Sequence, residues 1–272
     1  MIVERPLSIA EIFDRTVTIV VRRWKVLGVL GVLGSAPDML VSASAYGRVT
    51  DNAALLGQFL LDVAAGAIIG GAAVLAAGAD EAPRSALAVL RAALARFWSL
   101  LGATILIGLL ILAVLVVGAI PGLVAARTGG NVAGIVVTAA VVPLAVFPAL
   151  VLCLAFPIVV LERVGAAAGI RRALERARRD GLRRAFLLGL AFLAFVIGLP
   201  LAVSAGLATL ADLPGLWLVN VVVPLVNDLL LGTLGTALIT VSAVDYRVRS
   251  EGTDLAAAAD AGPAFAEGRR AL

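Results

Sequence analysis

Two carboxylates inside long apolar stretches are the first candidates for chemistry in this sequence. Asp62 lies within the otherwise uncharged segment 53–79, and Asp228 follows Asn227 within the otherwise uncharged segment 213–244. A carboxylate in hydrocarbon costs roughly 2.5–3.5 kcal/mol, so it usually faces a cavity or a partner. Because neither segment holds a cation, we expect Asp228 to carry a proton.

Asp62, Asn227 and Asp228 therefore form a candidate intramembrane polar site with two interpretations. In the functional interpretation, protonation of the acids serves a proton- or cation-coupled path. In the structural interpretation, which we favour, a neutral carboxyl only hydrogen-bonds a neighbouring backbone group that a proline has left without its helical partner.

Other kinds of catalytic site are largely excluded by residue types. The chain holds no histidine and one cysteine, Cys153. An intrachain disulfide, a Cys/His metal site and histidine-dependent nucleophilic catalysis are therefore impossible. The two acids show no glycine-flanked aspartate motif that would favour an aspartyl protease dyad. We expect no enzyme, no cofactor and no metal, and we expect Glu251 and Asp254 to cap or pair with Arg247 and Arg249.

The composition is that of a membrane protein. Hydrophobic residues make up 62% of the 272 residues and charged residues 15%, against about 45–50% and about 25% in soluble domains. The net charge of +4 does not indicate nucleic acid, because the basic residues lie at the ends of apolar segments. No apolar segment with a small-residue cleavage site follows the N-terminus, so we expect no removable signal peptide.

The arginine-rich stretch 162–184 sets the predicted topology. It holds eight arginines, and uncharged segments flank it on both sides. A hydrocarbon core needs about 20 apolar residues per helix. The sequence as a whole predicts six such spans, at about 26–46, 53–79, 99–126, 132–161, 185–211 and 216–244. A turn is predicted at 127–131, and Gly66 and Gly70 are spaced for a close helix contact.

The basic residues fall almost entirely on one side of these spans. Only Arg48 and Arg127 lie in the loops of the opposite side. The positive-inside rule then places both termini in the cytoplasm of a bacterial inner-membrane protein. Residues 1–255 form one integral membrane domain, and residues 256–272 are expected to be a mobile cytoplasmic tail.

Amphipathic segments precede the pairs of spans, near Ser8, Ser85 and Gly169. Ser8 and Glu11 fit a capping box. Segment 8–23 either lies in the interface or extends the first span. The segments mark three parallel two-span units, or only a six-span protein with long cytoplasmic loops.

The third amphipathic segment is the most basic. Its arginines either bind anionic lipid headgroups or an acidic partner, or serve only to hold the loop inside. The candidate lipid contacts are Arg171, Arg172, Arg176, Arg179 and Arg183.

The two ends of the membrane region carry a family resemblance. Segment 5–15 reads RPLSIAEIFDR, and segment 245–255 reads DYRVRSEGTDL. They resemble the R-P-L-S-x-x-E-I-x-D-R opening and the Y-D-L-R-V-R-x-E-G-x-D-L ending of the bacterial membrane-domain family of glycerophosphoryl diester phosphodiesterase, with Asp245-Tyr246 in place of Tyr-Asp-Leu. In some relatives this domain precedes a catalytic phosphodiesterase barrel that supplies histidines and metal-binding carboxylates. With no histidine here, the resemblance implies a stand-alone membrane domain without the hydrolase.

The sequence therefore predicts an all-α, six-span membrane protein with amphipathic helices on the cytoplasmic face. Its predicted role is non-enzymatic, as a lipid-contacting scaffold or accessory subunit. The alternative is a small secondary transporter or channel that uses Asp62 and Asp228. Expected partners are membrane lipids, and a membrane protein or a second copy of the chain, but not nucleic acid.

Overall fold

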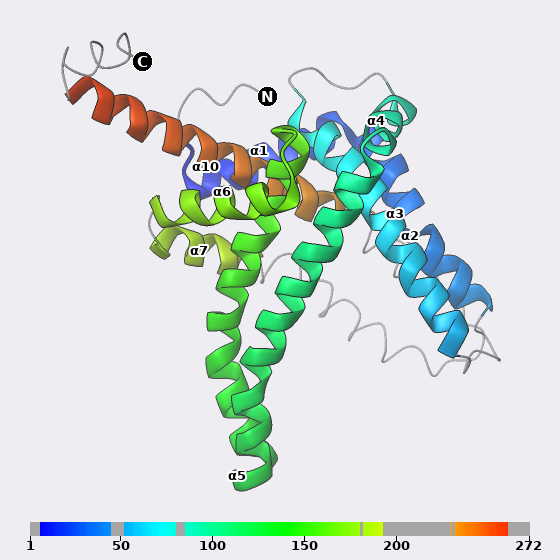
Figure 1. Ribbon diagram of the computed structural model, residues 1–272, viewed down its shortest axis with the longest axis vertical. Coiled ribbons are helices and arrows are strands. Elements are labelled where there is room, and N and C mark those ends of the chain that lie inside the picture. Colours follow the sequence, from blue (N-terminus) through cyan, green and yellow to red (C-terminus); the bar gives the residue numbers. More distant parts are fainter. Residues whose placement is uncertain are drawn as a thin grey trace.

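The described part of the chain is all-helical, as predicted. The computed structural model describes residues 6–44, 52–79, 85–179, 182–192, 229 and 232–260. Its helices are α1 (Ile9–Arg22), α2 (Trp24–Ser44), α3 (Asn52–Gly78), α4 (Ala86–Leu94), α5 (Phe97–Leu161), α6 (Ala166–Arg179), α7 (Leu182–Phe192) and α10 (Thr233–Asp260). Figure 1 shows α2 and α3 side by side, the long α5 hairpin beside them, and α10 crossing near α1 and α6.

Helix α1 begins with the predicted capping box. The Glu11 N–H donates to Ser8 Oγ at 3.2 Å, and the Ser8 N–H donates to the Glu11 carboxylate at 2.7 Å. The helix ends at Arg23, whose backbone is non-helical, and α2 starts at Trp24. Helix α1 is therefore a separate helix that packs on α10, and not a continuation of the first predicted span.

Helix α5 is a hairpin, and its turn lies where the sequence predicted one. Gly130 has a φ of 81° inside an otherwise helical run, a conformation that glycine adopts without steric penalty. Figure 1 shows the two long limbs of α5 meeting at the bottom of the view. Gly134 on the second limb lies against Ala126 on the first, close enough that a Cβ would clash. The limbs correspond to the third and fourth predicted spans.

Two helices in the described part are long and apolar enough to cross a membrane, Phe59–Gly78 in α3 and Phe97–Gly134 in α5. Trp24–Ala36 and Val151–Leu161 are apolar but shorter. Most of the fifth predicted span and the first half of the sixth lie outside the described residues. Helix α10 continues to Asp260, past the predicted start of the tail, since its alanine-rich end favours helix.

Arginines join the helix ends at one side of the molecule. The Arg23 guanidinium donates to the carbonyl oxygens of Ala76 and of Ala79, the latter at 2.7 Å. The Arg96 guanidinium donates to Val160 and Val159 at 3.0 and 3.4 Å. The last carbonyls of a helix lack intrahelical partners, and a cation also complements the helix dipole there. These two contacts bring the start of α2 to the end of α3, and the start of α5 to its own end.

Two adjoining apolar cores hold the helices together. One core gathers residues of α1, α5, α6 and α10. The other gathers residues of α2, α3, α4 and the two ends of α5, and Phe156 of α5 packs against both. Helix α6 lies very close to the second limb of α5 at Gly169. A Cβ added to Gly169 would clash with Val159 Cγ2 and would lie 3.2 Å from the Ala155 carbonyl oxygen.

Gly66 and Gly70 do not form the close helix contact that their spacing suggested. A Cβ on Gly66 would have no neighbour within 4 Å, and one on Gly70 would meet only the Phe156 ring at 3.6 Å. A close contact of α3 is made one residue later, where a Cβ added to Gly71 would lie 2.7 Å from a Leu100 methyl group. Cavities, described below, separate α3 from its neighbours at Gly66.

Replacing Gly169 with alanine is expected to destabilise the protein by about 1–3 kcal/mol, since the added methyl group overpacks the contact with α5. The matched control is Gly102→Ala, because no atom lies within 4 Å of a Cβ at Gly102. That variant should unfold as the parent does or slightly later, since alanine favours helix over glycine. Thermal unfolding of both variants in detergent micelles measures the difference. Equal stabilities would contradict the close packing of α6 on α5.

Candidate functional site

Asp245 on α10 is a charged residue that is fully buried in the described part of the chain, with a side chain that is 0% exposed. Its carboxylate accepts hydrogen bonds from the Leu7 N–H at 2.7 Å, from Arg184 Nη2 at 2.8 Å and from Arg249 Nε at 3.0 Å. Both arginines also donate to the Leu7 carbonyl oxygen, each at 2.6 Å. We call Leu7, Arg184, Asp245 and Arg249 the Asp245 cluster.

The Asp245 cluster joins three segments that are far apart in the sequence. Leu7 precedes α1, Arg184 belongs to α7, and Asp245 and Arg249 are one turn apart on α10. A buried charge is tolerated when it is paired and fully hydrogen-bonded. Here the carboxylate accepts from the Leu7 N–H, and the two guanidinium groups donate to the Leu7 carbonyl oxygen, so both backbone polar groups of Leu7 are satisfied. This geometry fixes the position of α1.

A second ion cluster lies where α5 ends and α6 begins. Glu162 accepts from Arg172 at 2.5 Å, and its other oxygen lies 2.6 Å from a nitrogen of Arg176. Burial acts to raise the pKa of Glu162, but the hydrogen bonds and charges of Arg176 and Arg172 outweigh burial and lower it. These contacts hold α6 at its angle to α5.

The predicted lipid-binding arginines therefore divide into two groups. Arg172 and Arg176 are half-buried and paired with Glu162. Arg171 and Arg179 are exposed, and so is Arg178, which the sequence analysis did not include. The side chain of Arg183 lies outside the described residues. The third amphipathic helix thus uses part of its charge internally and presents the rest at the surface.

The predicted pairing near the C-terminal end of the membrane region is partly confirmed. Arg247 donates to Glu251 at 2.7 Å, and this hydrogen bond raises the pKa of Arg247. Arg249 pairs with Asp245, one turn earlier on the same helix. The side chain of Asp254 lies outside the described residues.

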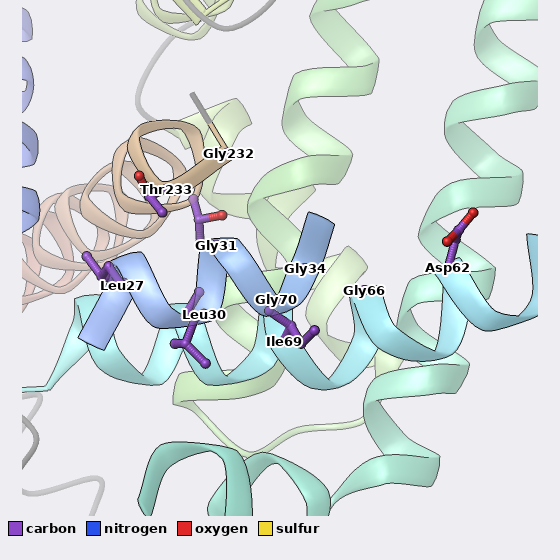
Figure 2. A pocket seen from close by; sticks show the side chains of 12 residues that line it. Leu27, Leu30, Gly31, Gly34, Asp62, Gly66, Ile69, Gly70, Gly232 and Thr233 are labelled. Atoms are coloured by element: carbon purple, nitrogen blue, oxygen red, sulfur yellow. The ribbon is translucent and has the colours of Figure 1, made fainter. Parts of the chain in front are cut away.

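Asp62, the first of the candidate intramembrane acids, lines a cavity of about 340 Å³ between α2, α3 and α10. Figure 2 shows Asp62, Gly66 and Gly70 following one another along α3, with Gly31 of α2 and Thr233 of α10 toward the other end. Thr236 also lines this cavity. Asn227 and Asp228 lie outside the described residues, so their predicted grouping with Asp62 stays a prediction.

A second cavity, of about 350 Å³, lies on another side of the same glycines. It is lined mainly by apolar side chains of α3, α5 and α10, among them Ile107, Phe156 and Ile239. Cys153 and Thr104 also line it, and the buried Thr104 hydroxyl has no hydrogen-bond partner in the described part of the chain. Gly66, Gly70 and Thr236 line both cavities.

Sequence reasoning missed the residues that hold the described helices in place. From the sequence, Asp245 is only a departure from a motif, and Arg23 and Arg96 are only two of the basic residues that fall on one side of the predicted spans. Their signal was an acid at the end of an apolar segment and an arginine directly before each of two spans. Within the described residues, no group of three or more Cys, Asp or Glu side chains is placed to hold a metal ion.

Comparisons with known proteins add no assignment. No protein-family model matches the chain, and no curated protein or solved structure shows significant similarity to it.

Replacing Asp245 with asparagine is expected to destabilise the protein by roughly 3–5 kcal/mol, because Arg184 and Arg249 lose the charge that balances them in a buried site. Glu251→Gln is the control, since it removes an exposed partner of an arginine on the same helix and should cost about 1 kcal/mol or less. Thermal unfolding in micelles compares the two variants. Similar losses for both would contradict a structural role specific to the Asp245 cluster.

The stabilisation by Glu162 is expected to depend on pH. Its pKa is lowered in the folded protein, so its contribution is fully present above about pH 4.3, the ordinary value for glutamate, and is lost as pH falls through the lowered value. Glu162→Gln should therefore lower the free energy of unfolding by about 1.5–3 kcal/mol at pH 7. The difference from the parent should shrink on acidification below pH 4. A difference that stays constant down to pH 3 would contradict this assignment.

Proposed function

We propose that this protein is a non-enzymatic integral membrane protein of a bacterial inner membrane, acting as a lipid-contacting scaffold or accessory subunit. The observation that carries the proposal is the outward-facing apolar surface of α5. In the helix Phe97–Gly134, only 18% of the most apolar window is buried, whereas the core helix of a soluble protein is mostly buried. Such a surface is stable when lipid tails surround it.

We propose six spans with both termini in the cytoplasm. The arginine contacts that join the ends of α2, α3 and α5 at one side support this arrangement, because charged groups gather there and the Gly130 turn lies at the opposite end of α5. Trp24 and Trp98 are 52% and 80% exposed at this same side. Exposed tryptophans are typical of the membrane–water interface.

The cytoplasmic-face helices are the proposed contact with lipid headgroups. On α4, Leu87 and Leu94 are exposed while Val89 and Ala93 are buried, so the helix has apolar side chains available to enter the interface. Arg171, Arg178 and Arg179 of α6 are exposed and positively charged. Apolar and basic side chains together are the combination with which interfacial helices bind anionic bilayers.

Three related two-span units are part of the proposal. In the first two units, a serine caps an amphipathic helix, and an arginine just beyond that helix caps the last helix of its own unit. Arg184, which follows α6, reaches Asp245 on α10 in the third. The shared arrangement supports a repeat in which one arginine closes each unit.

The resemblance to the membrane-domain family of glycerophosphoryl diester phosphodiesterase remains part of the proposal. The two segments that carry it are in contact, since Leu7 of the first is bonded to Asp245 and Arg249 of the second. The alternative role, a transporter or channel, finds support in the cavity beside Asp62. That role also requires Asp228 to lie on the same path, and Asp228 is outside the described residues. We therefore retain the scaffold as the primary proposal.

Cysteine labelling tests the proposed topology. Thr128 lies beside the Gly130 turn and Ala167 lies on α6, and both are exposed. In a Cys153→Ala background, Thr128→Cys should react with a membrane-impermeant thiol reagent in intact cells. Ala167→Cys should react only in inverted vesicles. Reaction of both positions from the same side would overturn the topology.

Lipid retention tests the contact role. A triple variant in which glutamine replaces Arg171, Arg178 and Arg179 should retain less anionic phospholipid after purification. Native mass spectrometry measures the amount of bound lipid. Each basic residue near an anionic surface is worth about 1 kcal/mol. Arg127→Gln, at the opposite end of the hairpin, should leave retention unchanged. Equal retention by the triple variant and the parent would count against the lipid-contacting role of α6.

A further inference from the structure

The two cavities beside α3 share part of their lining, and we refer to them as the first and second branch of one candidate site. Gly66, Gly70 and Thr236 line both of them, and their volumes are about 340 and 350 Å³. Small-molecule sites in proteins range from about 300 to 1,000 Å³. The space exists because Gly66 has no side chain and no neighbour within 4 Å of where its Cβ would be.

The first branch presents hydrogen-bond acceptors. Asp62 contributes a carboxylate, and Thr233 contributes a hydroxyl whose hydrogen is donated to the Leu229 carbonyl oxygen at 2.5 Å. A hydroxyl that donates in this way offers only lone pairs to a further partner. A carboxylate in a low-dielectric region strongly favours a cation. This branch is complementary to an ammonium group.

The second branch suits an apolar chain. Ile107, Ile111 and Ile239 line it together with the Phe156 ring. The Thr104 hydroxyl is buried there without a hydrogen-bond partner in the described part of the structure. A buried polar atom without a partner is uncommon and calls for an explanation, such as a bound molecule with an acceptor. The second branch therefore points to an occupant independently of Asp62.

We propose that the two branches are continuous and together bind a cationic amphiphile, with its ammonium head at Asp62 and its apolar chain beside Phe156. The site rests on the membrane placement proposed above, and it adds a specific ligand class to a protein otherwise proposed to contact lipid in general. The charge of Asp62 selects the head, and the absence of a side chain at Gly66 admits the chain.

The test is the binding of radiolabelled lauroylcholine, which combines a quaternary ammonium, an ester acceptor and one apolar chain. The full-length protein is inserted into nanodiscs of phosphatidylglycerol, which carries no amine, and binding to empty nanodiscs is subtracted. Lauroylcholine should bind saturably, and laurate should not compete. Asp62→Asn should weaken binding about tenfold, the scale of one charge-assisted contact.

Two glycine variants on α3 provide the matched control. Gly66→Leu fills the shared part of the space and should abolish binding. Gly57→Leu should bind as the parent does, because Gly57 is exposed and lines neither cavity. Unchanged binding by Asp62→Asn or by Gly66→Leu would overturn the proposal, as would equal competition by laurate.

Insertion is scored separately by co-migration of each variant with the nanodisc. A failure to insert would overturn the membrane placement, whereas an inserted parent protein that does not bind lauroylcholine would overturn the site alone. Displacement of lauroylcholine by lysophosphatidylethanolamine would assign the site to an amine-bearing membrane lipid. Binding that persists in its presence would assign the site to a free amphiphilic cation.

Discussion

The burial of a single carboxylate, that of Asp245, requires the rest of the chain to supply hydrogen-bond donors and positive charge. It is fully buried, so its charge must be met by donors within the protein. The Leu7 N–H, Arg184 and Arg249 meet it, and the two arginines are in turn held by the Leu7 carbonyl oxygen. The position of α1 against α10, and with it one of the two apolar cores, follows from satisfying this one group.

The other arginine contacts apply the same rule to helix ends. Arg23 and Arg96 satisfy carbonyl groups at the ends of α3 and α5, and Arg172 and Arg176 satisfy Glu162. The positive charges on one side of the molecule therefore serve two purposes. They mark the proposed cytoplasmic side, and they also close the backbone hydrogen bonding of helices whose apolar surfaces face outward.

Local signals in the sequence predicted local structure well. The capping box at Ser8 and the turn at Gly130 depend on residues within a few positions of each other, and both were predicted. The Asp245 cluster depends on residues up to 242 positions apart, and no local pattern encodes that pairing.

The Gly66-x-x-x-Gly70 spacing was a misleading signal for the same reason. Whether small residues meet a neighbour or border a cavity is decided by helices elsewhere in the chain. The space beside Asp62 could likewise not be predicted, because three separate helices form its walls.

The long separation between Leu7 and Asp245 has a consequence for how the protein is made. A ribosome adding roughly 5–20 residues per second needs on the order of 10 to 50 seconds to pass from one to the other. The limbs of α5 meet within a few residues of Gly130, so that hairpin can close almost as soon as it is synthesised. The amino-terminal helix must instead wait for the last helix before its position is fixed. Its docking on α10 is thus a late event in biogenesis, and a truncated chain that ends before Asp245 would leave the first residues accessible to proteases.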